Sequence, residues 1–368
     1  MPFPVVQVGG TPYEMGLQHG RQAREQVRAF VEHVIRAARP SVECPADTHR
    51  ERVLGGAAQF LPWFEAHAPV LLDEVRGLAE GAGLSFAEAL LPQIRGEIAP
   101  LVRNEGCTTF AVAAEQTTTG GRLIGQTSDM ERAMEDYFLV LHVLPSQGPR
   151  LLMWTFAGQL GYHGVSEWGV AHFANSVSGG PASPRGIPGG VPHYPLKRRL
   201  YECRTQADVL ALFHQIPVCS SGNYMLSAGG GCTGDAASVP AIFDVEATPA
   251  GPALLEDSAG EGFLVHTNHF LSPCFRTAET DRAALPDSFP RLDRMTSLLQ
   301  EARGKIGVDR MRTFLADHAN HPCSICRHEG DGEGRMVTVG GLIAEPDAGR
   351  LHVSRGNPCR GDWSTYSV

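Results

Sequence analysis

The sequence lacks the features that mark several large classes of protein. Its 31 Lys and Arg residues include no long basic run and the formal net charge is -9, so nothing favours a nucleic-acid phosphate backbone. No window approaches the length of a membrane-spanning helix, and residues 1–6 lack the basic segment and apolar stretch of a secretion signal. We therefore expect a cytoplasmic, soluble protein with neither nucleic acid nor a membrane as its partner.

The cysteine content also argues against a disulfide framework. Nine cysteines, an odd number, are dispersed over 368 residues without a secretion signal, which favours free thiols. A composition of 42% hydrophobic and 19% charged residues suits a globular protein with a sizeable core. A chemically active cysteine is therefore one of the options to examine.

The first hundred residues are predicted to be rich in helices. Between Glu14 and Ala38 the apolar residues recur with the spacing of an amphipathic helix, at Val27, Phe30, Val31, Val34 and Ile35. Ser85 and Glu88 have the Ser-x-x-Glu spacing of a capping box. This pair predicts another helix start near residue 85.

The pattern changes to strands at Gly106. Short β-prone runs at 108–112 and 122–124 flank a polar turn and predict a hairpin whose first strand begins at Cys107. Further strands are expected at 137–144, 151–156 and, as a pair, within 337–353, with helices at 192–203 and 289–303 and a long loop at 176–195. These blocks indicate an α+β layered protein.

Two groups of cysteine and histidine suggest a metal site as an alternative. Cys323 and Cys326 form a Cys-x-x-Cys pair, and His266 with His269 could complete a Cys2His2 zinc site in an unprocessed protein. The two pairs are too far apart in the sequence for a compact zinc ribbon, and small metal motifs often match by chance. Zinc binding by these four residues remains the minority hypothesis.

Cys107 taken alone would be read as a small buried apolar residue at the start of a strand. However, Gly106-Cys107-Thr108-Thr109 resembles the processing site of the isopenicillin N acyltransferase (acyl-coenzyme A:6-aminopenicillanic acid acyltransferase) family of Ntn hydrolases. Other matching motifs follow in the family's order: Tyr13 to Gly16 with His19-Gly20, Arg95-Gly96-Glu97, residues 265–269, Pro286-Asp287-Ser288 with Arg291, residues 324–327, and Gly356-Asn357-Pro358-Cys359. The resemblance covers the chain nearly from end to end.

This resemblance implies the four-layer αββα Ntn-hydrolase fold and a chain that cuts its own Gly106-Cys107 bond. Residues 1–106 would become a helix-rich α subunit and residues 107–368 a catalytic β subunit, and the two fragments would stay associated as one folded unit. Cleavage would make Cys107 an N-terminal residue, which supplies both a thiol nucleophile and an α-amino base. The Gly106 backbone, without a Cβ, can bend as the bond is attacked.

The resemblance also implies roles for four catalytic residues, with Cys107 as the nucleophile. Asn268 is the expected oxyanion-hole side chain, since a neutral amide donates a hydrogen bond without adding charge; a turn residue is the alternative. Asp129 is expected to position the Cys107 amine. Arg327 is expected to pair with Asp129 or to hold an acidic group of the substrate, unless it forms only a surface ion pair.

Three polar residues, Asn175, His266 and His269, are candidates for the substrate pocket, although Asn175 could equally serve a turn. We expect a thiol amide hydrolase or acyltransferase that needs no cofactor and acts on a small N-acyl amide, with an amine or acyl-CoA as the other partner. At Gly222 the fungal acyltransferase has a serine, which argues against a penicillin substrate. The remaining alternative is a catalytically silent binding protein of the same fold.

Overall fold

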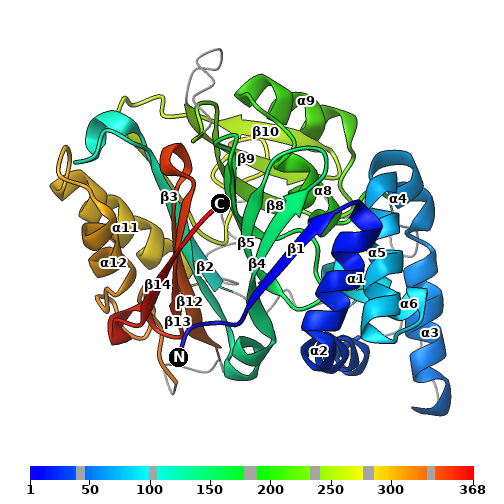
Figure 1. The fold of residues 1–368 in the computed structure, drawn as a ribbon. Coiled ribbons are helices and arrows are strands. Elements are labelled where there is room, and N and C mark those ends of the chain that lie inside the picture. The colour runs from blue at the N-terminus through cyan, green and yellow to red at the C-terminus, as the bar shows by residue number, and fades with distance from the viewer. Residues whose placement is uncertain (39–45, 99–105, 178–188, 233–240, 277–285, 330–335) are drawn as a thin grey trace.

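A computed structural model describes residues 1–38, 46–98, 106–177, 189–232, 241–276, 286–329 and 336–368. Figure 1 shows two β-sheets that lie face to face, with one group of helices on the outer face of each sheet. The described part of the chain thus forms four layers in the order helix, sheet, sheet, helix. The predicted αββα arrangement of an α+β protein is confirmed.

The first sheet has eight strands in the order β1-β4-β5-β6-β7-β8-β9-β10. Their bounds are Val5–Gly10, Phe138–Pro145, Leu151–Phe156, His163–Ser166, Ala171–Ser176, Gly222–Ala228, Ala241–Thr248 and Gly251–Leu255. β1 pairs with β4 in parallel, whereas the other neighbours are antiparallel. The N-terminal segment therefore contributes an edge strand to a sheet otherwise built from residues after 107.

The second sheet has six strands in the order β11-β2-β3-β12-β13-β14. Their bounds are Phe263–His266, Gly106–Val112, Leu123–Glu131, Met336–Glu345, Arg350–Arg355 and Trp363–Ser367. β2 and β3 form the predicted antiparallel hairpin, in which Gly106 lies opposite Asp129 and Cys107 opposite Ser128. The hairpin therefore brings an acidic residue to the start of the strand that carries Cys107.

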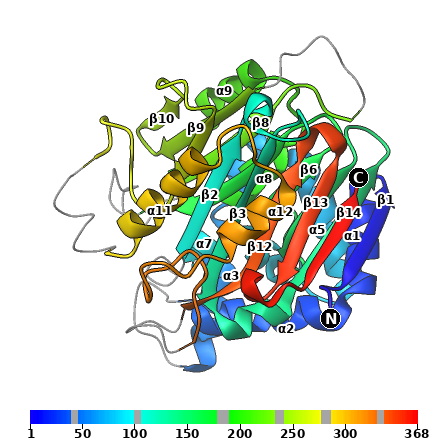
Figure 2. The same cartoon turned by 90° about the vertical axis from the view of Figure 1, so that its left-hand side faces the viewer.

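The helices divide between the two outer faces. Those of the N-terminal segment are α1 (Pro12–Gln22), α2 (Arg24–Ala37), α3 (Ala46–Ala58), α4 (Leu61–His67), α5 (Pro69–Ala82), α6 (Phe86–Leu90) and α7 (Arg95–Ile98). Later come α8 (His193–Leu200), α9 (Gln206–Gln215), α11 (Ser288–Glu301) and α12 (Val308–Leu315). Figure 2 shows α11 and α12 lying over the outer face of the six-stranded sheet.

Two apolar clusters fill the space between these layers. The larger contains residues of both sheets and of the N-terminal helices, among them Trp154, Phe30 and Ala111. The smaller joins the six-stranded sheet to α11 and α12 and contains Phe110 and Val112. Because successive side chains of a strand point to opposite faces, Cys107 shares the face of Ala111, which is directed toward the other sheet.

Close packing of α1 against α5 explains the small residues of the N-terminal motif. A Cβ on Gly16 would lie 1.9 Å from the Glu74 carbonyl oxygen, and one on Gly77 would lie 2.0 Å from the Tyr13 carbonyl oxygen. Both distances are far below van der Waals contact, so only glycine allows the two helix backbones to approach this closely.

Most of the predicted elements are present, with two differences near the N-terminus. The capping box of Ser85 and Glu88 is confirmed at the start of α6. The helix predicted from Glu14 to Ala38 is instead two helices that meet at Ala23, whose N–H donates to the His19 carbonyl oxygen. β1 was not predicted, because its alternation of buried and exposed residues extends over only a few positions.

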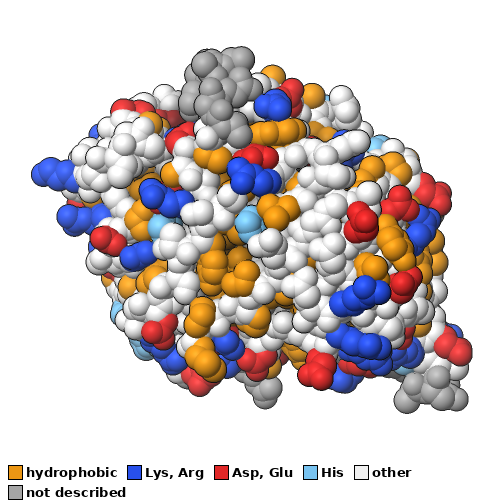
Figure 3. All heavy atoms as spheres, in the orientation of Figure 1, with side chains coloured by type: hydrophobic (Ala, Val, Ile, Leu, Met, Phe, Trp, Pro, Cys, Tyr) orange, Lys and Arg blue, Asp and Glu red, His pale blue; other side chains and the backbone are white. Residues whose placement is uncertain are grey.

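Part of the predicted loop at 176–195 lies outside the described residues, which resume at 189 and lead into α8. None of the described helices is both long enough and apolar enough to cross a membrane. Figure 3 shows acidic and basic side chains interspersed over the face seen in that view.

Candidate active site

Cys107 lies at the beginning of β2, an interior strand of the six-stranded sheet, and only 6% of its surface is exposed. Its neighbours on the two faces of β2 point to different layers. Thr109 donates from Oγ1 to Asn175 Oδ1 on β7 of the other sheet, 2.9 Å away, and Thr108 Oγ1 accepts from Arg291 on α11 at 2.9 Å. Cys107 is therefore fixed where the two sheets and the outer helix layer converge.

Hydrogen bonds hold both main-chain polar groups of Cys107. Its N–H donates to Asn268 Oδ1 at 3.0 Å. Its carbonyl oxygen accepts from Arg291 Nη1 at 2.5 Å and from Asn175 Nδ2 at 3.3 Å. The residue thus has little freedom to move, as a preorganised reacting group requires.

Asn268 follows β11 and is 2% exposed. Its Oδ1 accepts from both the Cys107 N–H and Arg291 Nη2, the latter at 2.7 Å, while its Nδ2 donates to the Ser176 carbonyl oxygen at 2.9 Å. The predicted side chain is therefore next to Cys107, but its acceptor atom is the one that faces the Cys107 nitrogen. This geometry suits a group that positions the nitrogen, and the oxyanion-hole role stays a prediction.

Arg291 and Arg327 share one carboxylate behind Cys107. Arg291 is 1% exposed and its Nη2 lies 2.9 Å from Asp287 Oδ2, and Arg327 Nη2 bonds to the same oxygen. Although burial opposes its ionisation, the two guanidinium groups hold the pKa of Asp287 below its usual range. Asp287 is therefore the anion that the two buried guanidinium groups share.

Asp129 on β3 is fully buried beside the bond between Gly106 and Cys107. Its Oδ1 accepts from Thr338 Oγ1 at 2.7 Å, and its Oδ2 lies 3.6 Å from Arg327 Nε. Burial raises the pKa of Asp129, and the nearby arginines oppose this only in part. The predicted proximity of Asp129 to Arg327 is therefore present, while its role toward the Cys107 amine stays a prediction.

The side chain of Asp129 also explains the glycine before Cys107. A Cβ built on Gly106 would lie 3.0 Å from Asp129 Oδ2 and 3.4 Å from Asp129 Cβ. A side chain at this position would press on the carboxylate, which would have to shift by a few tenths of an ångström. Glycine thus avoids a tight contact with the residue that the strand register places opposite it.

Asn175 connects Cys107 to a buried polar network in the eight-stranded sheet. Its Oδ1 accepts from Asn223 Nδ2 on β8 at 3.1 Å as well as from Thr109. The network continues to Asp244, whose pKa is raised by burial to about 7 and which interacts with Asn223. Asn175 thus lies next to Cys107, and its assignment to a substrate pocket stays a prediction.

The two predicted pocket histidines are buried and bonded within the protein. His266 Nε2 lies 2.9 Å from Glu246 Oε1, and its Nδ1 lies 2.8 Å from the Thr267 carbonyl oxygen. Burial opposes its protonation, but the carboxylates of Asp244 and Glu246 outweigh burial and raise the pKa of His266. His269 Nδ1 lies 2.8 Å from Ser288 Oγ. Both rings support the turn that carries Asn268.

The zinc site predicted from His266, His269, Cys323 and Cys326 is wrong. The histidines of that set are occupied by Glu246 and Ser288, and the four do not form a metal-binding group within the described residues. Cys326 lies instead among His318, His328 and Cys359. The pairing failed because sequence order alone does not show which histidines face a cysteine.

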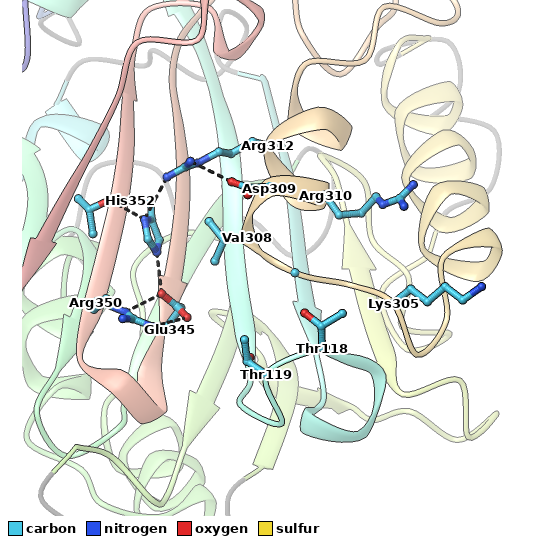
Figure 4. A pocket seen from close by; sticks show the side chains of 12 residues that line it. Thr118, Thr119, Lys305, Val308, Asp309, Arg310, Arg312, Glu345, Arg350 and His352 are labelled. Carbon is cyan, nitrogen blue, oxygen red and sulfur yellow. Dashed lines mark hydrogen bonds and ion pairs between the residues drawn. The ribbon is translucent and has the colours of Figure 1, made fainter.

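One surface pocket lies away from this site. Its volume is about 560 Å³, and it is lined by residues such as Thr118, Arg312 and Glu345. Figure 4 shows that its charged side chains bond to one another, as where His352 lies between Glu345 and Arg312. None of the predicted catalytic residues lines it, and Thr118 follows the end of β2 opposite to Cys107.

Sequence reasoning missed two residues that the site uses. Arg291 and Asp287 were noticed only as parts of a motif, because Asp and Arg four residues apart at a helix start are usually a local ion pair. The signal that could have found them is the apolar character of α11, whose buried face contains Arg291 among Met295, Leu298 and Leu299. A charged residue within such a face needs a buried partner.

The similarity to known proteins is consistent with this geometry. The model of the acyl-coenzyme A:6-aminopenicillanic acid acyl-transferase family matches residues 116–360. The 40 kDa form of acyl-coenzyme A:6-aminopenicillanic-acid-acyltransferase of Emericella nidulans is 26% identical over 352 residues, which cover 95% of this chain and 91% of that protein. The family match therefore spans all the site residues after β2, and the full-length relative extends the similarity over the N-terminal segment.

Two solved structures of conjugated bile acid hydrolase from Clostridium perfringens, each of a single-residue variant, are also similar. They are 13% and 14% identical, with TM-scores of 0.41 and 0.42, and each match covers 71% of this chain and 97% of the hydrolase. Because the family model covers most of the chain, the protein belongs to the acyl-coenzyme A:6-aminopenicillanic acid acyl-transferase family of Ntn-type enzymes.

Proposed function

We propose that this protein is a self-processing thiol enzyme that takes up an acyl group on Cys107. The observation that carries the proposal is the arrangement around Cys107, whose nitrogen is held by Asn268 and whose carbonyl oxygen is held by Arg291 and Asn175. These contacts fix the residue at both main-chain ends. The thiol is the nucleophilic group that a residue held in this way would present to an acyl donor.

Processing would begin when the Cys107 thiol attacks the carbonyl carbon of Gly106. A sulfur–carbon bond forms, the Gly106-Cys107 peptide bond breaks, and the released nitrogen takes up the thiol proton. Water then hydrolyses the thioester, which leaves a carboxylate on Gly106 and a free thiol on Cys107. The products are residues 1–106 and 107–368, and the ladder between β1 and β4 supports their staying together.

The new α-amino group would serve as the base of the catalytic cycle. Its usual pKa is about 7.7–8.0 and that of a thiol is about 8.5, so the amine can accept the thiol proton near neutral pH. The nitrogen already faces Asn268 Oδ1, an acceptor that suits an amine as well as a peptide N–H. Asn268 would therefore orient the base, and Asp129 with Arg327 would set the charge around it.

We propose a small N-acyl amide as the acyl donor, with water or an amine as the acceptor, and an acyl-CoA as an alternative donor. The name of the relative from Emericella nidulans joins an acyl-coenzyme A to 6-aminopenicillanic acid. At Gly222 a Cβ would lie 2.8 Å from Cε1 of His193, so the serine expected in the fungal acyltransferase would press on this ring. A different amine is therefore proposed for this site.

A panel of N-acyl amides and acyl-CoA thioesters would test this function. Processed protein is mixed with each compound, quenched in acid, and analysed by mass spectrometry for an added acyl mass on the 107–368 fragment. We expect an adduct on Cys107 that is absent in Cys107→Ala and kept in Cys274→Ser, a matched change of an exposed free thiol. Adducts confined to other cysteines would contradict the proposal.

A further inference from the structure

Four side chains that the proposed chemistry does not use come together beside Arg327. They are His318, Cys326, His328 and Cys359, and their ligand atoms all lie within 4.8 Å of one another. Cys326 belongs to the 324–327 motif and Cys359 to the 356–359 motif. The two histidines come from the segment between α12 and β12.

Two of the separations match the edges of a metal tetrahedron, and the others lie within about 1 Å of them. His318 Nε2 lies 2.9 Å from His328 Nε2, and His328 Nε2 lies 3.8 Å from Cys326 Sγ and 3.5 Å from Cys359 Sγ. Zinc bound at about 2.3 Å to sulfur and about 2.0–2.1 Å to nitrogen requires ligand separations of roughly 3.3–3.8 Å. The two imidazole nitrogens lie closer together than this, and the widest separation in the group reaches 4.8 Å, so the side chains would have to adjust by up to about 1 Å around an ion.

The surroundings of the cluster also suit bound thiolates. Asn357 Nδ2 donates toward Cys326 Sγ at 3.6 Å and also to the Arg327 carbonyl oxygen. Asn357 is itself fully buried and accepts from Arg132 at 3.1 Å. Donors that orient the ligands from behind are typical of metal sites. Two soft sulfur and two imidazole ligands select zinc among the common divalent ions.

We propose that His318, Cys326, His328 and Cys359 bind one structural Zn²⁺ ion. The ion would join three segments of the chain: the turn after α12, the residues around Arg327, and the short 3-10 helix Pro358–Arg360. Two ligands flank Arg327, which contacts Asp129 and Asp287. The metal would therefore keep the Arg327 backbone in place without touching the substrate.

Metal analysis of tag-free full-length protein tests this site. The protein is purified under reducing conditions without chelator, supplied with Zn²⁺, dialysed, and analysed by inductively coupled plasma mass spectrometry. We expect about one zinc ion per chain for a four-ligand structural site, lost in Cys359→Ser and in His318→Ala. The matched controls Cys274→Ser and His214→Ala change an exposed thiol and an exposed imidazole elsewhere and should keep the zinc.

Two further measurements keep the test independent of folding and of catalysis. Co²⁺ in place of zinc in the wild-type chain should give the thiolate charge-transfer and visible bands of a tetrahedral site. The Cys107→Ala chain should bind zinc as the wild type does, whether or not it is cleaved. Absence of bound zinc in reduced wild-type protein, zinc retained by both ligand variants, or a Cys326-Cys359 disulfide in the isolated protein would overturn the proposal.

Discussion

Replacing Arg291 with lysine should damage the site even though the charge is kept. The Arg291 guanidinium bonds to four groups, namely the Cys107 carbonyl oxygen, Thr108 Oγ1, Asn268 Oδ1 and Asp287 Oδ2. A lysine has three donors on one atom, so it cannot reach opposite sides of the site at once. At least one of the four buried acceptors loses its donor, and because the three donors of a lysine share one nitrogen, we expect two acceptors to lose theirs.

The cost follows from the burial of these groups. A buried acceptor left without a donor costs about 1–3 kcal/mol, so two lost contacts cost roughly 2–6 kcal/mol of unfolding free energy. A shift of about 1 Å in Cys107 would also slow self-cleavage by roughly a hundredfold. Both effects should occur together, because the same bonds hold Cys107 and stabilise α11.

Arg294→Lys is the matched control on the same helix. Arg294 pairs with Asp317 at the surface, where 31% of its side chain is exposed, and such pairs contribute about 0–1 kcal/mol. Urea unfolding of both variants is to be followed by circular dichroism in a Cys107→Ala background, so that all chains have the same length. Equal stabilities of the two variants would refute the role assigned to Arg291.

Three further predictions concern glycines and one buried carboxylate. Gly16→Ala places a Cβ 1.9 Å from the Glu74 carbonyl oxygen and should lower the free energy of unfolding in urea by about 3 kcal/mol or more. In the control Gly55→Ala, the Cβ meets nothing within 4 Å in α3, so the free energy of unfolding should rise by about 0.5–1 kcal/mol. Equal effects of the two changes would contradict the close contact between α1 and α5. Gly106→Ala should slow self-cleavage about tenfold on denaturing gels by pressing on Asp129, and an unchanged rate would count against that steric argument. Burial raises the pKa of Glu97 from 4.5 to about 7, so the stability from its bound proton is present below pH 4.5 and lost as the pH rises through 7. The free energy of unfolding of Glu97→Gln, relative to that of wild type, should therefore rise by about 3 kcal/mol between pH 4.5 and pH 7. A difference that does not depend on pH would refute the shift in the pKa of Glu97.

The sequence predicted the elements whose patterns are local. The capping box at Ser85 and the hairpin that starts at Cys107 depend on neighbouring residues, and both are present as expected. The strand β1 was missed because a short edge strand has too few alternating residues to stand out. The break at Ala23 was missed because the apolar spacing continues across it.

The site could be predicted only where the family resemblance pointed to particular residues. Asp129, Asn175, Asn268 and Arg327 do lie around Cys107, but no local pattern predicts that Arg291 bonds to Cys107 from 184 positions away. The cysteine and histidine cluster shows the same limit. Cys326 was recognised as a candidate metal ligand, yet its neighbour Cys359 comes from the C-terminal turn, and only the folded sheet brings the two together.

Self-cleavage is the central claim, and the mass of the freshly purified protein under denaturing conditions tests it most directly. Wild-type protein should give two fragments, residues 1–106 and 107–368, with Cys107 at the new N-terminus. The Cys107→Ala chain should remain whole. A wild-type chain that stays whole through prolonged incubation, as the alanine variant does, would contradict the account, and so would cleavage at any other bond.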